Sequence, residues 1–103
     1  LRGSVAAKPV GRIVLDVNGV GYDVHVPATV HRKLLIDTQA VLLTYCHIRE
    51  DAFTIFGFLR DEEKALFEML LSVSGVGPKV ALSVLSAMSV AEFGRAVTEH
   101  DLT

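Results

Sequence analysis

Residues 71–82 read Leu71-Ser72-Val73-Ser74-Gly75-Val76-Gly77-Pro78-Lys79-Val80-Ala81-Leu82, and the rest of the chain is organised around this stretch. We interpret it as the end of one helix, a tight hairpin and the start of a second helix. Gly75 and Gly77 can take a positive φ at little steric cost, so the backbone can reverse direction here. Pro78 suits the first position of a helix, where its missing N–H would have no partner.

The same residues can form a phosphate-binding site. A Val76 side chain tucked inward would turn the surrounding amides outward, and free N–H groups at a helix N-terminus attract phosphate. Lys79 adds a cation one residue inside the helix. The stretch therefore predicts a sequence-independent clamp on a DNA backbone. A plain helical corner with a glycine stop and a proline start explains the same residues.

Upstream, the sequence pattern predicts a small barrel. Apolar residues alternate over residues 12–17 and 20–26, and Asn18-Gly19 between them is the strongest short hairpin signal. A short helical turn is expected over residues 29–35. The expected strands cover residues 1–7, 12–17, 20–26, 40–48 and 52–58. Five short strands joined by tight turns favour an antiparallel barrel of the OB-fold type.

After residue 59 the apolar period becomes helical. Asp61 is expected to cap the first helix, and Ser89 with Glu92 forms a capping box that opens a third helix to about residue 98. The apolar residues expected to bury the first two helices are Leu66, Phe67, Leu70, Leu71, Val73, Val80, Leu82, Val84 and Leu85. The predicted class is α+β: a five-stranded OB-fold barrel in residues 1–59, then an incomplete helix-hairpin-helix domain in residues 60–103.

Composition limits the possible functions. The chain has 103 residues, half of them apolar, and a net charge of −2. This balance counts against a nucleic-acid binder judged on bulk charge, so any DNA contact must come from a locally positive face and backbone amides. A single cysteine, Cys46, excludes an internal disulfide framework and fits a reducing cytoplasm. No apolar run approaches the roughly 20 residues that span a bilayer.

We expect no metal, cofactor or ATP site in this sequence. The four histidines and Cys46 fall in different elements, and the adjacent Cys46 and His47 would point to opposite faces of a strand. The ligand spacing of structural zinc sites is missing. The hairpin also lacks the spacing of a Walker-type phosphate loop.

Glu50 and Asp51 are consecutive carboxylates at an expected hairpin tip, next to Arg49. A catalytic acid needs a carboxyl group withdrawn from solvent, which a loop tip does not provide. A soluble turn is one interpretation of these residues. Another is that the two carboxylates repel phosphates and push strands apart where several backbones converge.

The chain resembles the RuvA family, which recognises four-way Holliday junctions. The resemblance rests on the order and spacing of four segments that together cover nearly the whole chain. They are Leu1-Arg2-Gly3, residues 14–27, Arg49-Glu50-Asp51-Ala52 leading to Phe56-Gly57-Phe58, and residues 70–85.

The resemblance implies a homotetramer with fourfold symmetry that binds four-way junction DNA without catalysis. It implies that Gly75, Val76, Gly77 and Lys79 hold DNA phosphates. It also implies that Glu50 and Asp51 form an acidic pin at the crossover, with Arg49 as a candidate cation beside it. The expected partners are the RuvB motor, which hydrolyses ATP, and the RuvC nuclease.

The chain departs from the family at both ends. The second hairpin and the motor-binding domain of the family are not in this sequence, and neither are the first residues. We therefore interpret it as a fragment, and expect no motor binding from these residues.

Two other functions stay open from the sequence. A helix-hairpin-helix nuclease or glycosylase fragment would need clustered carboxylates or a catalytic lysine near the hairpin, and only Lys79 is close. An OB-fold module for single-stranded DNA or a protein partner would stack bases on exposed aromatic residues. The aromatic residues in question, which fall mainly in strand patterns suited to burial, are Tyr22, Tyr45, Phe53, Phe56 and Phe58.

Overall fold

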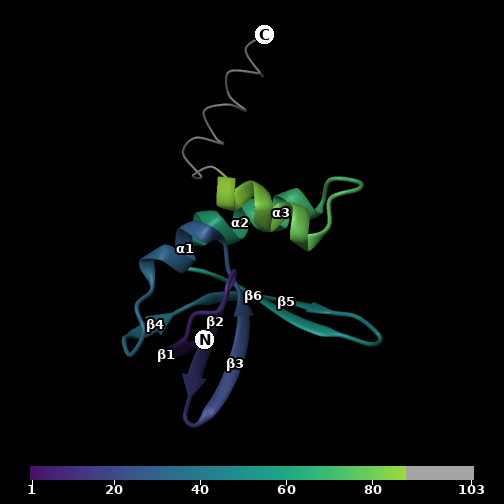
Figure 1. Cartoon of the computed structure of the whole chain (residues 1–103). Helices are drawn as coiled ribbons and strands as arrows, with labels where there is room; N and C mark the ends of the chain where they lie inside the picture. The colour runs from purple at the N-terminus through teal and green to yellow at the C-terminus, as the bar shows by residue number, and fades with distance from the viewer. Residues whose placement is uncertain (88–103) are drawn as a thin grey trace.

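The computed structural model describes residues 1–87 and contains a curled β-sheet with helices packed against it (Figure 1). In chain order the elements are β1 (Arg2–Ala7), β2 (Arg12–Val17), β3 (Val20–His25), α1 (Ala28–Lys33), β4 (Gln39–Val41), β5 (Leu43–Ile48), β6 (Phe53–Phe58), α2 (Asp61–Leu71) and α3 (Pro78–Ala87). The predicted α+β class is confirmed. The third helix, predicted from Ser89 and Glu92 onward, lies outside the described residues. No helix within residues 1–87 is long and apolar enough to cross a membrane.

The hairpin between β2 and β3 forms as the sequence predicts. Asn18 and Gly19 both have a positive φ, at 52° and 89°. The carboxylate of Asp16 accepts a hydrogen bond from the Gly19 N–H at 2.8 Å. This turn fixes the register of the two strands, so that Val17 faces Val20 at one end and Arg12 faces His25 at the other.

The prediction of one strand over residues 40–48 is wrong, because the chain changes partners at Leu42. β4 pairs with β1, whereas β5 pairs with β6. Leu42 between them is fully buried, and its backbone exchanges two hydrogen bonds of 2.7 Å with Leu1. The side chain of Leu42 turns into the core and lies against Gly57 of β6, where any larger residue would collide with Val24. The inward turn of Leu42 bends the predicted strand and divides it into β4 and β5.

Within the described residues the sheet has six strands in the order β4-β1-β2-β3-β6-β5. All neighbours are antiparallel except β3 and β6, which run parallel. β4 and β5 stand at the two ends of this order although only Leu42 separates them in the chain, so the sheet curls back toward itself. Counted as two arms of one bent strand, they give the five strands of an OB-fold.

A first hydrophobic core fills the inside of the curled sheet and is covered by α1. Its buried residues are Val5, Ile13, Leu15, Val24, Val26, Val30, Leu34, Ala40 and Leu42. The apolar alternation predicted over residues 12–17 is seen in β2, where Ile13 and Leu15 are fully buried and the residue between them is not.

A second core joins the sheet to the helices, and Phe67 of α2 lies at its centre. The Phe67 ring is 5.0 Å from Phe58, 5.1 Å from Phe56 and 5.5 Å from Tyr45, measured between ring centroids. Aromatic pairs at this range each contribute about 0.5–1.5 kcal/mol beyond the area that they bury. Ala81 and Leu85 of α3 complete the core. The helices are therefore fixed on the face of β5 and β6.

Three details of the predicted helices are wrong. The N-cap position of α2 is Arg60, and Asp61 is already helical. The buried carboxylate of Glu63 accepts hydrogen bonds from the N–H groups of Leu59 and Arg60, at 3.1 and 2.9 Å. Glu63 therefore caps the start of α2, the role that was expected of Asp61. Val73 and Val80 were expected in the buried stripes, but both are about half exposed. Ala81 and Leu85, four residues apart, face the core instead, which turns Val80 outward.

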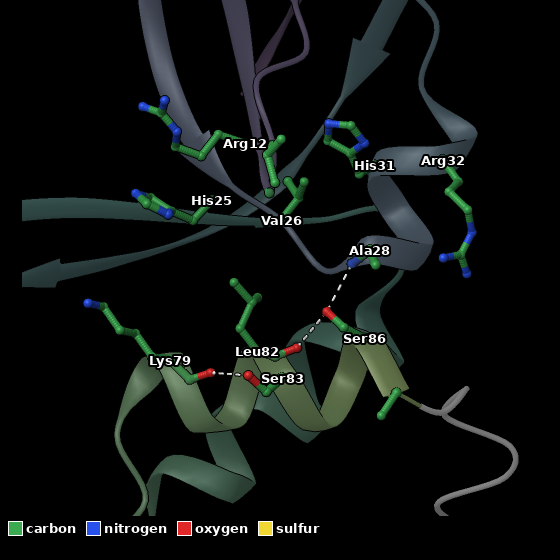
Figure 2. A pocket seen from close by; sticks show the side chains of 13 residues that line it. Arg12, His25, Val26, Ala28, His31, Arg32, Lys79, Leu82, Ser83 and Ser86 are labelled. Carbon is green, nitrogen blue, oxygen red and sulfur yellow. Dashed lines mark hydrogen bonds between the residues drawn. The ribbon is translucent and has the colours of Figure 1, made fainter.

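Ser86 ties α3 to α1. Its hydroxyl accepts from the backbone N–H of Ala28 at 3.0 Å and donates to the carbonyl of Leu82 at 2.9 Å (Figure 2). Ala28 is the first residue of α1, so its N–H has no acceptor within its own helix. The Ser86 hydroxyl of α3 supplies that acceptor and so links the two helices.

We expect Ser86→Ala to lower the free energy of unfolding by about 1 kcal/mol, because the partly buried N–H of Ala28 is left without an acceptor. Urea unfolding followed by circular dichroism measures the change. Ser83→Ala is the matched control on the same helix, since within residues 1–87 the Ser83 hydroxyl bonds only to the Lys79 carbonyl of its own helix. Its cost should stay within about 0.5 kcal/mol. Equal midpoints for the two variants would show that the link to α1 contributes nothing.

Candidate nucleic-acid interface

Residues 72–77 form the bend that joins α2 to α3 (Figure 1). Of its two glycines only Gly75 uses a positive φ, at 85°. The N–H of Val76 donates to the carbonyl of Val73 at 3.1 Å and closes the turn. Pro78 is the first residue of α3, as predicted. The chain therefore reverses direction by means of one left-handed residue and one internal hydrogen bond.

Several backbone N–H groups of the bend have no hydrogen-bond acceptor among residues 1–87. Val76 packs its side chain against the second core, as predicted. No residue in the described part of the chain accepts a hydrogen bond from the N–H of Gly75, Gly77 or Lys79. Apart from the adjoining residues, no atom of the described chain lies within 4 Å of the position that a Cβ would take at either glycine. These donors precede or begin α3, where the helix dipole favours an anion, so the bend is open to a phosphate-sized group.

Lys79 supplies a cation beside these donors. The residue is exposed, and its ammonium forms no ion pair with any residue from 1 to 87. Figure 2 shows its side chain leaving α3 on the side that faces His25 of the sheet. An anion held by the bend would therefore have a free positive charge next to it.

The second predicted group of residues lies at the tip of the hairpin between β5 and β6. The N–H of Arg49 donates to the carbonyl of Ala52 at 2.7 Å, which closes the turn around Glu50 and Asp51. Both carboxylates are exposed. The guanidinium of Arg49 donates from Nε to Nε2 of His47 at 2.8 Å, so it folds back along β5 and leaves the two carboxylates alone at the tip.

The structure brings the predicted residues together in two groups. Gly75, Val76, Gly77 and Lys79 share the bend, and Arg49, Glu50 and Asp51 share the hairpin tip. Both loops project on the same side of the view in Figure 1, with the second core behind them. The two groups thus lie on separate protruding loops, with charge of opposite sign.

A basic cleft between the sheet and α3 was not predicted from the sequence. Arg12 and His25 line it from the sheet, Arg32 from α1, and Lys79 from α3 (Figure 2). Counting outward from the Asn18-Gly19 turn makes Arg12 and His25 cross-strand neighbours, so their pairing could have been predicted from the sequence. Their position opposite Lys79 depends on how the helices dock, and no local pattern contains that information.

Comparison with known proteins gives consistent matches for the two parts of the chain. Residues 1–57 match the family model described as RuvA N terminal domain, and residues 67–103 match the model described as SAM-like Helix-hairpin-helix tandem.

Curated relatives match nearly the whole chain. A protein of Symbiobacterium thermophilum is 50% identical over 103 residues, which are 99% of this chain and 50% of the relative. A protein of Chloroherpeton thalassium is 43% identical over 102 residues, which are 98% of this chain and 51% of the relative. Both relatives are named Holliday junction branch migration complex subunit RuvA. The chain spans about half the length of these relatives.

The two glycines of the bend should respond differently to substitution. Gly75→Ala places a side chain at a φ of 85° and should lower the free energy of unfolding by about 1 kcal/mol. Gly77→Ala meets no atom within 4 Å and no unusual φ, so it should change stability by less than about 0.5 kcal/mol. Urea unfolding of both variants measures the difference, and an equal loss from both would mean that the bend has another conformation.

Proposed function

Because the chain belongs to the RuvA family, we propose that it binds four-way junction DNA as a non-catalytic, structure-specific subunit of a branch migration complex. The RuvA N terminal domain model covers more than half of the chain. The curated relatives carry the name of that complex. Within the proposal the sheet, residues 1–59, and the helical part, residues 60–103, act as one scaffold for two DNA-contacting loops.

The observation that carries the proposal is the open bend between α2 and α3. The N–H groups of Gly75, Gly77 and Lys79 have no acceptor among the described residues, and free space lies over both glycines. Backbone amides contact phosphate oxygens without reading bases. A clamp of this kind suits a protein that must hold arms of any sequence.

Lys79 strengthens the clamp through charge. Neutralising a phosphate with a lysine releases condensed counterions from DNA, so the contact weakens as salt rises. Val76 has a structural role in this scheme, since its side chain anchors the bend on the second core and keeps the neighbouring amides outward. The donors of the bend are thus already turned outward in the chain without DNA.

Glu50 and Asp51 have the opposite role in the proposal. They are exposed at the end of a projecting hairpin and have no cation within salt-bridge distance among residues 1–87. Two carboxylates in this position repel phosphates. In a homotetramer, four such tips around a crossover would keep the strands apart, and Arg49 would turn from His47 to the nearest phosphate.

The proposal extends to the assembly. We infer a homotetramer that places one junction arm on each subunit. ATP hydrolysis would then belong to the RuvB motor, and RuvC would be the nuclease that acts on the same junction. This division of labour explains how a chain without a Walker-type phosphate loop takes part in strand movement.

Single-strand binding through the sheet has less support. That function uses exposed aromatic side chains as stacking platforms. Here Phe56 and Phe58 are buried, Tyr22 and Tyr45 are partly buried, and Phe53 is the exposed aromatic residue of β6. Its neighbours at the tip are the carboxylates Glu50 and Asp51, which disfavour a nucleic-acid backbone.

We expect Gly77→Ala to weaken binding to four-way junctions and to linear duplex by about tenfold or more, because the added methyl occupies the place of a phosphate oxygen and a charge-assisted bond is lost. Fluorescence anisotropy with labelled junction and duplex measures both affinities. Ser74→Ala is the control in the same bend, since it adds no atom over the amides. An affinity of Gly77→Ala equal to that of Ser74→Ala would remove the clamp from the proposal.

The double change Glu50→Gln with Asp51→Asn should keep or tighten the affinity for junction and duplex, because it removes two charges that repel phosphates. It should also reduce the fluorescence of 2-aminopurine placed at the crossover, since the bases there would stack again. Glu62→Gln with Glu68→Gln removes the same charge from exposed positions of α2 and controls for the net-charge effect. A clear loss of affinity only in the tip variant would contradict the pin.

A further inference from the structure

A cleft of about 760 Å³ lies between the end of the β2–β3 ladder, α1 and α3 (Figure 2). Five basic residues line it, and no carboxylate of the described chain is among its lining residues. These five are Arg12, His25, His31, Arg32 and Lys79. The floor between them is largely apolar, with Val26 and Leu82 as its main side chains. The cleft is therefore a groove with a cationic rim.

Three of the five basic residues gather at the end of the cleft that adjoins the α2–α3 bend. Figure 2 shows the nitrogen-bearing ends of Arg12, His25 and Lys79 on the same side, whereas Arg32 points out at the opposite side. His31 already has a partner within the protein, because its Nε2 forms a hydrogen bond with the carbonyl of Pro9 at 2.9 Å. Arg12, His25 and Lys79 therefore lie where the cleft meets the bend.

Arg12 and His25 are held in place by the sheet. They face each other across the β2–β3 ladder, so their side chains emerge together on one face. The His25 ring also packs against Phe56, at 5.6 Å between ring centroids. Groups fixed in this way need little ordering when a ligand binds, which favours affinity.

Asp23 restrains Arg12. A guanidinium nitrogen of Arg12 lies 2.7 Å from a carboxylate oxygen of Asp23, and both side chains are close to half exposed. Exposed ion pairs are worth little, about 0–1 kcal/mol, so a phosphate can compete for Arg12. The pair holds Arg12 near the mouth of the cleft and lowers its net attraction for anions.

We propose that Arg12 and His25, with Lys79 opposite them, form a second phosphate-binding subsite for the DNA strand that the bend holds, and that Asp23 limits its strength. The inference rests on the proposed function and adds the sheet to the DNA-contacting surface. Lys79 is the link, because it lies two residues after Gly77 and also lines the cleft. A backbone leaving the amide donors of the bend thus meets Arg12 and His25 of the sheet next.

The test is a double-mutant cycle on the full chain, read by anisotropy with four-way junction and linear duplex. Arg12→Gln should weaken both by about fivefold and reduce the slope of log affinity against log salt by about one. His25→Gln should act in the same direction. Asp23→Asn should tighten binding by about two- to fivefold, because Arg12 is released, and a gain of this kind cannot come from misfolding.

The cycle separates a direct contact from a general charge effect. If Arg12 contacts the phosphate, Asp23→Asn should lose its benefit in the Arg12→Gln background. Glu68→Gln is the matched control, since it frees Lys64 from an exposed ion pair on α2, outside the cleft. Arg32→Gln removes a cation from the other end of the cleft and should have little effect.

Three outcomes overturn the subsite while leaving the proposed function intact: Arg12→Gln behaves like Arg32→Gln, the benefit of Asp23→Asn persists without Arg12, or inorganic phosphate binds the cleft and DNA affinity ignores all the variants. An unaltered chain that binds neither junction nor duplex would refute the proposed function and the subsite together. Retained binding with an insensitive Arg12 refutes the subsite alone.

Discussion

The packing of Phe67 against Phe56 and Phe58 holds the helices on the sheet, and the position of the α2–α3 bend relative to the sheet depends on it. The three rings are buried in the second core. The centroid of the Phe67 ring lies 5.1 Å from that of Phe56 and 5.0 Å from that of Phe58. Because Val76 rests on the same core, the bend with its free amides is set relative to the sheet. Without this contact the α2–α3 bend would have no fixed position relative to Arg12 and His25 of the sheet.

Local chemistry explains why some features could be predicted from the sequence. Asn18-Gly19 accepts two positive φ angles, so the turn and the register of β2 and β3 follow from two residues. The stretch from Gly75 to Pro78 likewise ends one helix and begins another through its own residues, since Gly75 takes a positive φ and Pro78 occupies the first position of α3. Both loops of the candidate interface were located in this way, since turns are determined by the residues within them.

The features that the sequence did not predict depend on contacts between distant residues. The strand predicted over residues 40–48 has a continuous apolar pattern, and only the space inside the sheet makes Leu42 turn inward. Val80 fits a helical stripe as well as Ala81 does, and the docking of α3 on α2 decides between them. The basic cleft arises for the same reason, because Lys79 meets Arg12 and His25 only after the helices have docked. The arrangement also shows how a chain of net charge −2 can present a cationic groove.

The division of one strand at Leu42 has a consequence for how the molecule folds. Closing the sheet pairs Arg2 with Val41 and Val24 with Ile55, so the chain must form long loops before these contacts stabilise it. Topologies of this kind fold slowly compared with local helical hairpins. The docking face for α2 includes Phe56 and Phe58 of β6, the last strand of the chain order. During synthesis the helices therefore emerge just as their platform is completed, and the sheet, rather than the helices, sets the time at which the whole body becomes native.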